Sequence, residues 1–178
     1  MTRHVVLLRG INLGSRNRIA MPELRALLEA AGYEDVQTYL QSGNVVVSSG
    51  ASADAVARDV ERCLERELGL DIAVVVRSAS QLATVVRRNP LADVATDPKR
   101  YQVSFLSARL PAAKVRELRA LAHPDERLVA AGRELYAWHP NGVGRSRLWA
   151  RLAGRDLGVT ATARNWTTVT NLLALAES

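Results

Sequence analysis

Three short segments of the chain collect residue types that are suited to binding an anion. The first runs from residue 9 to residue 18, between a β-branched run and an amphipathic stretch. A loop that precedes a helix exposes backbone N–H groups at the positive end of the helix dipole, and arginine adds forked donors. The candidate contacts here are Arg9, Gly10, Asn12, Gly14, Arg16, Asn17 and Arg18. The segment lacks the Gly-Lys-Ser/Thr ending of a P-loop and the full G-x-G-x-x-G spacing.

Similar residues occur in a tight turn and in two later segments. The turn at 41–44 contributes two candidates, and the segments 141–147 and 162–167 contribute three each. They are Ser42 and Asn44, then Gly144, Ser146 and Arg147, then Arg164, Asn165 and Trp166. Ser146 and Thr162 also stand where they can cap a following helix. Plain turn or capping roles therefore remain alternatives to ligand contact, and a tryptophan such as Trp166 is more typical of a core or an interface.

No set of residues completes a catalytic or metal-binding signature. The three histidines stand far apart in the sequence, without a second ligand at a metal-binding spacing. His139 follows Trp138 at a predicted strand end, where a surface role competes with a catalytic one. Cys63 lies on the apolar stripe of a predicted helix, which favours packing over a nucleophilic role. We therefore expect no metal and no cofactor, and the sequence leaves open whether the protein is an enzyme.

The charge of the chain is unevenly distributed. The formal net charge is +6, made up of +4 over residues 1–18, −5 over 19–98 and +7 over 99–178. A basic face of this kind is typical of proteins that bind a phosphate-bearing ligand or nucleic acid. The alternative is solvated surface charge from a codon preference, because 22 of the 24 basic residues are arginine.

The first half predicts a β-α-β-β-α-β order. Strands are expected at 4–9, 36–40, 45–48 and 72–76, and helices at 21–31 and 52–68, from apolar periodicity and from glycines that end elements. This is the split order of ferredoxin-like units. A single-strand RNA reader of the recognition-motif type is disfavoured, because the chain has one Phe and such sheets stack bases on aromatic residues.

The second half predicts a looser copy of the same order. Helices are expected at 81–88, 111–122 and 146–152, a strand at 101–107, and a hairpin from 127–131 and 134–138, with a helix at 163–176 in place of a last strand. The fold class is therefore α+β, with two ferredoxin-like halves and mainly antiparallel sheets, the second half being irregular with a C-terminal helix. We expect the halves 1–78 and 79–178 to pack together as one compact unit.

Composition points to a reducing compartment and away from a membrane. The apolar run at residues 5–8 is too short for a signal peptide, and no stretch approaches the ~18 apolar residues of a membrane span. The single cysteine excludes an internal disulfide. We expect a cytoplasmic protein without a membrane partner, and sheets of this kind also allow a homodimer.

Five motifs in order resemble the bacterial domain-of-unknown-function 1697 family. They are Leu8-Arg9-Gly10-Ile11-Asn12-x-Gly14, Met21-x-x-Leu24, Leu40-Gln41-Ser42-Gly43-Asn44-Val45, Gly144-Arg145-Ser146-x-Leu148, and Thr162-Ala163-Arg164-Asn165-Trp166-x-Thr168-Val169. The resemblance spans nearly the whole chain and implies a compact α+β fold with repeated ferredoxin-like halves, but no activity. Arg147 stands where the family pattern has lysine, which keeps the charge and changes the donor geometry.

Three functional hypotheses follow from these observations. The first is an anion-binding protein for a nucleotide, a phosphorylated ligand or nucleic acid. The second is an enzyme acting on a phosphorylated or nucleotide-like substrate, with Ser42, Asn44, His139 or Arg164 near the reaction. The third is a structural or partner-binding protein without a small-molecule site, in which the glycine, asparagine and tryptophan motifs only build turns. The first agrees best with the charge distribution and the loop chemistry.

Overall fold

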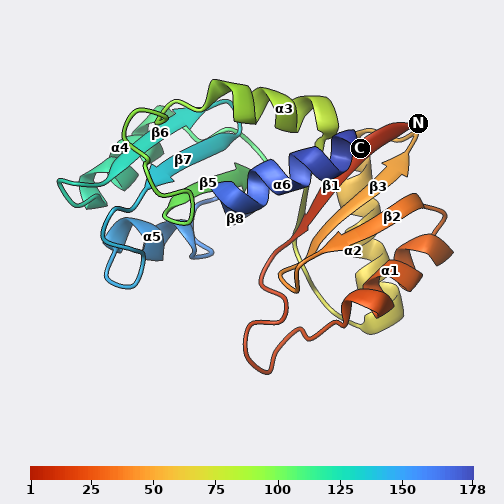
Figure 1. The fold of residues 1–178 in the computed structure, drawn as a ribbon. Helices are drawn as coiled ribbons and strands as arrows, with labels where there is room; N and C mark the ends of the chain where they lie inside the picture. The colour runs from red at the N-terminus through yellow and green to blue at the C-terminus, as the bar shows by residue number, and fades with distance from the viewer. The chain divides into compact units, whose positions relative to one another are not determined.

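The computed structural model describes residues 1–178, and contacts within the chain divide it into two units (Figure 1). Unit 1 comprises Met1–Thr84 together with Asn171–Ser178, and unit 2 comprises Val85–Thr170. The division of the sequence into the halves 1–78 and 79–178, packed as one compact unit, stays a prediction. None of the helices combines the length and the apolar run that crossing a membrane requires.

Unit 1 contains a four-stranded antiparallel sheet with two helices on one face. The strands are β1 (Thr2–Leu8), β2 (Glu34–Tyr39), β3 (Asn44–Ser49) and β4 (Val74–Ser78), in the order β2-β3-β1-β4. The helices α1 (Met21–Ala30) and α2 (Ala53–Leu68) follow β1 and β3. The predicted β-α-β-β-α-β order of the first half is confirmed.

The core of unit 1 forms where the apolar stripes of α1 and α2 meet one face of the sheet. Leu24 and Leu28 of α1 and Val56, Val60 and Leu64 of α2 are fully buried against it. The strands present β-branched residues to this face, as strand propensity favours. Their opposite face is buried as well, which explains why β1 is a nearly continuous apolar run.

Two further helices cross the division between the units. Helix α3 (Ala79–Arg88) passes from unit 1 into unit 2, and α6 (Trp166–Glu177) returns from unit 2 to unit 1. The returning end of α6 is held in unit 1 by a hydrogen bond from the side chain of Asn171 to the hydroxyl of Tyr39 (2.8 Å). Leu172 and Ala176 in the same stretch are buried.

Unit 2 has the same kind of sheet. Strands β5 (Tyr101–Leu106), β6 (Arg127–Ala131), β7 (Glu134–Trp138) and β8 (Ala161–Asn165) are antiparallel in the order β6-β7-β5-β8. Helices α4 (Ala112–Leu121) and α5 (Arg147–Leu152) bury Leu118, Leu148 and Leu152 in its core. The α+β class with two such sheets and a C-terminal helix is confirmed.

One predicted element of unit 2 is wrong. The sequence favoured a helix from residue 163, but residues 161–165 form β8, and α6 begins at Trp166. Strand β5 is paired with β7 on one side, so its other edge leaves backbone groups that β8 satisfies, with Val103 opposite Arg164. Tertiary pairing outweighs the helical preference of the alanines in this short stretch.

Candidate functional site

The N-terminal loop is closed by the side chain of Asn12. Its amide nitrogen donates to the carbonyl oxygens of Ile19 (2.9 Å) and Gln41 (2.8 Å), and its oxygen accepts from the backbone N–H of Ile19 (2.9 Å). The backbone at Asn12 lies in the left-handed region (φ 56°), which asparagine tolerates better than most residues. Asn12 therefore joins the two ends of the loop and ties them to the turn at 41–44.

That turn is itself held by internal hydrogen bonds. The amide nitrogen of buried Asn44 donates to the carbonyl oxygen of Tyr39 (2.9 Å) and to the hydroxyl of Ser42 (2.8 Å). The backbone N–H of Leu8 donates to the carbonyl oxygen of Gly43 (2.9 Å). The structure thus brings two predicted site segments together in unit 1, and their asparagine amides are engaged in building the contact.

The arginines of the N-terminal loop differ in how far they are engaged. Arg18 donates to the carbonyl oxygen of Gly14 (2.8 Å), and the backbone N–H of Arg9 donates to Ala73 (2.9 Å). Arg16 is exposed, and Gly10, Gly14 and Asn17 supply the positive φ angles that turn the loop. A ligand role for these residues stays a prediction.

Segment 144–147 leads into a buried polar cluster. Ser146 caps α5, as the sequence predicts, by accepting from the backbone N–H of Trp149 (3.0 Å). Its hydroxyl donates to Glu126 Oε2 (2.6 Å), and the same oxygen lies 2.5 Å from His139 Nδ1. Glu126 Oε1 accepts from the backbone N–H of His123 (2.9 Å). One carboxylate therefore collects three donors.

The electrostatics of this cluster follow from its burial and its hydrogen bonds. Burial acts to raise the pKa of Glu126, but the hydrogen bonds from Ser146, the backbone of His123 and His139 outweigh it and lower the pKa. Because Ser146 bonds to a carboxylate and not to the imidazole, the hydroxyl–imidazole pair of nucleophilic catalysis is not formed. Sequence reasoning missed Glu126, which lies 13 residues from His139 and 20 from Ser146 with no local motif to join them.

The residues of segment 162–166 are occupied in the junction between β8 and α6. Arg164 donates to the hydroxyl of Thr162 (2.7 Å) and to the carbonyl of Ala163 (2.8 Å), and burial lowers its pKa to about 10, so it stays charged at neutral pH. Asn165 accepts from the backbone N–H of Thr168 (2.9 Å) and is the residue that caps α6, in place of Thr162. Trp166 stacks on Tyr101, with ring centroids 4.8 Å apart. The partners named here for segment 162–166 are other residues than Glu126, which is the partner of Ser146 in segment 144–147.

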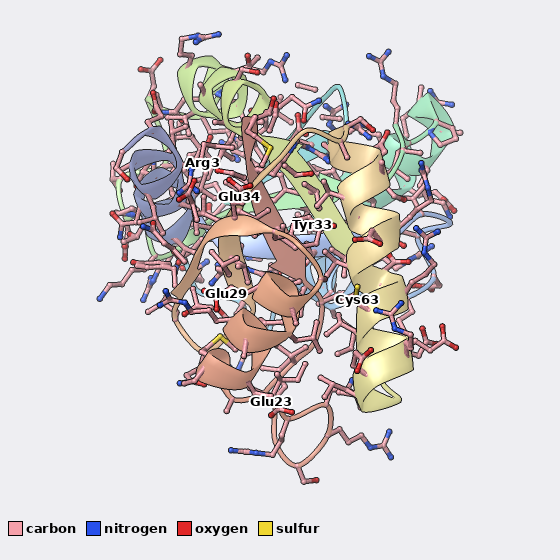
Figure 2. All side chains as sticks on the ribbon, turned by 90° about the vertical axis from the view of Figure 1, so that its right-hand side faces the viewer. Arg3, Glu23, Glu29, Tyr33, Glu34 and Cys63 are labelled. Atoms are coloured by element: carbon pink, nitrogen blue, oxygen red, sulfur yellow. The ribbon has the colours of Figure 1, made fainter.

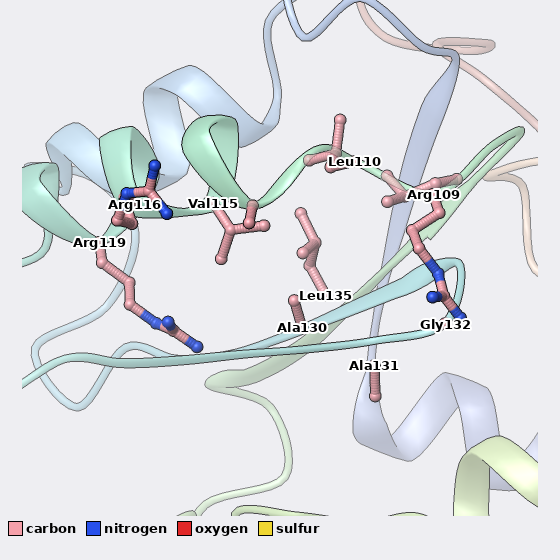
Figure 3. A pocket seen from close by; sticks show the side chains of 11 residues that line it. Arg109, Leu110, Val115, Arg116, Arg119, Ala130, Ala131, Gly132 and Leu135 are labelled. Carbon is pink, nitrogen blue, oxygen red and sulfur yellow. The ribbon is translucent and has the colours of Figure 1, made fainter.

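Another concentration of positive side chains surrounds a cavity in unit 2, between α4 and the β6–β7 hairpin. This arginine cavity has a volume of about 590 Å³. Its walls carry Leu106, Arg109, Leu110, Ala112, Val115, Arg116, Arg119, Ala130, Ala131, Gly132 and Leu135, with no acidic residue among them. Figure 3 shows Arg109 beside Gly132 on one side, and Arg116 and Arg119 on the other, with Leu135 and Ala130 between them.

The guanidinium groups of the arginine cavity are mostly uncommitted. Arg119 Nε donates to the carbonyl oxygen of Leu128 (3.3 Å), whereas Arg109 and Arg116 are exposed and have no hydrogen-bond or ion-pair partner. Sequence reasoning missed this cavity, because the apolar stripe of helix 111–122 predicts only the face that packs in the core. The signal was present: the helix carries one acidic residue, Glu117, against Lys114, Arg116 and Arg119.

A smaller cavity of about 310 Å³ lies between α1 and α2 in unit 1. Figure 2 shows Cys63 on α2 and Glu23 on α1, which both line it. Arg66 contacts the sulfur of Cys63 (3.8 Å), yet burial raises the pKa of the thiol. With Glu23 and Glu67 also on its walls, this cavity combines a protonated thiol with mixed charge and favours no ligand class.

Comparison with known proteins supports the family and the fold. The family model described as "Protein of unknown function (DUF1697)" matches residues 1–136. The chain is also similar to the conserved bacterial protein SP0830 from Streptococcus pneumoniae, with a TM-score of 0.79 and 23% identity over 98% of each chain. At that identity the likeness concerns the fold alone. No curated protein sequence matches the chain.

Proposed function

Because this chain belongs to the DUF1697 family, which is described as having unknown function, we propose a function from its own residues: it binds an anionic, phosphate-bearing ligand in the arginine cavity. The observation that carries this proposal is the presence of three arginines around one cavity whose lining includes no carboxylate. Guanidinium groups bind phosphate and carboxylate oxygens through paired, charge-assisted hydrogen bonds.

The charge balance of unit 2 supports the proposal. The unit carries fifteen Lys or Arg against seven Asp or Glu, whereas unit 1 carries nine against eleven. Two acidic residues near the cavity already have partners: Glu117 Oε2 lies 3.2 Å from Lys114 Nζ, and Glu134 Oε1 lies 3.7 Å from Arg88. An incoming anion would therefore meet little competition from the protein's own carboxylates and a favourable field.

Exposed loop arginines and a cytoplasmic location also fit this proposal. The loop arginines Arg16 in unit 1 and Arg147 in unit 2 are exposed, and each is a further candidate contact for an anion within its own unit. A cytoplasmic location, supported by the single cysteine, would give the protein access to nucleotides and phosphorylated metabolites.

The proposal is tested by calorimetric titration of the full chain with inorganic pyrophosphate at low salt. The variant Arg109→Gln/Arg116→Gln is expected to bind at least tenfold more weakly, since each charge-assisted hydrogen bond contributes roughly 1.5–3 kcal/mol. The matched control is Arg145→Gln/Arg155→Gln, which removes the same charge from two exposed, unpartnered arginines of unit 2 outside the cavity. Its affinity is expected to stay within about twofold.

Two results would contradict the proposal. The first is undetectable binding of pyrophosphate to the wild-type chain at low salt. The second is an equal loss in both double variants, which would mean that general surface charge, and not the cavity, attracts the anion. A parallel titration with a short single-stranded RNA separates the ligand sources. If RNA affinity falls steeply with rising salt, and both double variants weaken it to the same extent, the basic surface would be assigned to nucleic acid binding.

A further inference from the structure

The arginine cavity has an apolar centre as well as a charged rim. Leu110, Val115 and Leu135 lie between the guanidinium of Arg109 and those of Arg116 and Arg119 (Figure 3). Leu110, Val115 and Leu135 are at most 7% exposed, so packing holds them in place and they form a floor of small apolar area. These side chains belong to the hydrophobic core of unit 2, and the part of them that faces the cavity favours only a ligand with apolar surface of its own.

We infer that the arginine cavity takes an amphiphilic anion, in which an apolar chain or ring carries a phosphate or carboxylate group. The apolar part would lie over Val115 and Leu135, and the anionic group would reach a guanidinium at the edge. The volume of about 590 Å³ is in the range of small-molecule sites. This inference rests on the proposed function and names the ligand class for the same site.

The side chains of the lining favour this class over nucleotides. A nucleotide requires hydrogen-bonding partners for its base and sugar, yet the cavity wall offers no Asn, Gln, Ser, Thr or acidic side chain. Its side chains are alkyl groups or guanidinium groups, apart from Gly132. Such a lining matches a ligand whose only polar part is its anionic group.

The test is a series of ligands with one head group and a growing chain. Inorganic phosphate, methyl phosphate, butyl phosphate and hexyl phosphate are titrated against the full chain as monomers. Affinity is expected to rise by about threefold for each methylene that the floor covers. The rise should disappear with the head-group binding in Arg109→Gln/Arg116→Gln and persist in Arg145→Gln/Arg155→Gln.

A wall variant tests the floor separately from the charges. Val115→Thr keeps the shape of the side chain and replaces one methyl group with a hydroxyl, so it should flatten the dependence on chain length and leave inorganic phosphate binding unchanged. Val129→Thr is the control, since Val129 lies on β6 and does not line the cavity. Urea unfolding checks that both variants fold. If a variant does not fold, the chain-length series on the wild-type chain still tests the inference.

The outcomes separate this inference from the proposed function. Equal affinity along the series, with inorganic phosphate still dependent on Arg109 and Arg116, would overturn the amphiphile and leave anion binding intact. Absence of binding for every member would overturn both. Cosedimentation with phosphatidylglycerol vesicles but not with phosphatidylcholine vesicles, without binding of monomeric hexyl phosphate, would also overturn the inference, since it would place the affinity at a lipid surface.

Discussion

Glu126 illustrates how a single residue can organise a polar interior without belonging to any motif. Its carboxylate accepts from Ser146 (2.6 Å), lies 2.5 Å from His139 Nδ1 and accepts from the backbone of His123 (2.9 Å), while it is nearly fully buried. Because these bonds favour the charged form, the pKa of Glu126 is lower in the folded chain than in the unfolded chain.

We expect this difference to appear in the dependence of stability on pH. Below the ordinary carboxyl pKa of about 4.5 the unfolded chain binds the proton first, so the stabilisation is present above that pH and is lost as pH falls through the folded pKa. Glu126→Gln should therefore flatten the fall in unfolding free energy between about pH 5 and pH 3, as measured by urea unfolding. Asp125→Asn, which removes an exposed neighbouring carboxylate, is the control. Parallel curves for the wild type and Glu126→Gln would contradict this account.

At this scale the sequence predicts roles that depend on neighbours in the chain. The hydroxyl oxygen of Ser146 accepts from the backbone N–H of Trp149, three residues later, so its capping role follows from spacing alone. The donors around Glu126 and the engagement of Asn12 with Gln41, 29 residues away, depend on tertiary folding. No local pattern contains that information.

Gly43 determines how closely two elements of unit 1 can approach. A Cβ at this position would lie 2.8 Å from Cδ1 of Ile11 and 2.9 Å from Cβ of Leu8, and the backbone has φ 83°. Glycine is thus required both by the left-handed backbone and by the contact between the 41–44 turn and the start of the N-terminal loop.

We expect Gly43→Ala to destabilise the chain by about 2–4 kcal/mol, since a positive φ and a steric clash act together. The measurement is urea unfolding followed by circular dichroism. Gly50→Ala is the matched control, because no atom lies within 4 Å of the methyl carbon that alanine would add there and its φ is not positive. Similar stabilities for the two variants would show that the turn relaxes at little cost.

Elements were predictable where their signals were internal to them. The stripes of α1 and α2 and the glycines that follow them define those helices in the sequence. Strand β8 is different, because it is only five residues long, a helix follows it directly, and its reason for being extended is the free edge of β5. Asn165 is the last residue of the strand and caps the helix. A window of residues long enough to show periodicity includes both elements, so the sequence pattern does not separate them.

The duplication of the fold is the part of the whole molecule that the sequence predicted best. Both halves show the β-α-β-β-α-β order, and both sheets have their two central strands in the same relative places. The return of residues 171–178 to unit 1 was not predictable, since the apolar face of α6 continues without interruption across Thr170. A helical stripe specifies burial but not the element that it is buried against.

We expect a chain ending at Thr170 to lose protection in unit 1. Removal of residues 171–178 deletes the buried side chains of Leu172 and Ala176 and the hydrogen bond to Tyr39. Amide hydrogen exchange in β1–β4 should become at least tenfold faster, in line with the cost of deleting a buried leucine. A chain lacking only the exposed residues Glu177 and Ser178 is the control. Unchanged exchange in the longer truncation would show that these residues do not stabilise unit 1.

The path of α6 also fixes an order of events at the ribosome. Residues 1–84 emerge first, yet the segment that completes their unit is translated only after the whole of Val85–Thr170. Nascent unit 1 therefore lacks part of its packing while Val85–Thr170 is being made, and a translation arrest between residues 85 and 170 would leave it without residues 171–178. In such a protein, the complete folding of the segment made first depends on the synthesis of the segment made last.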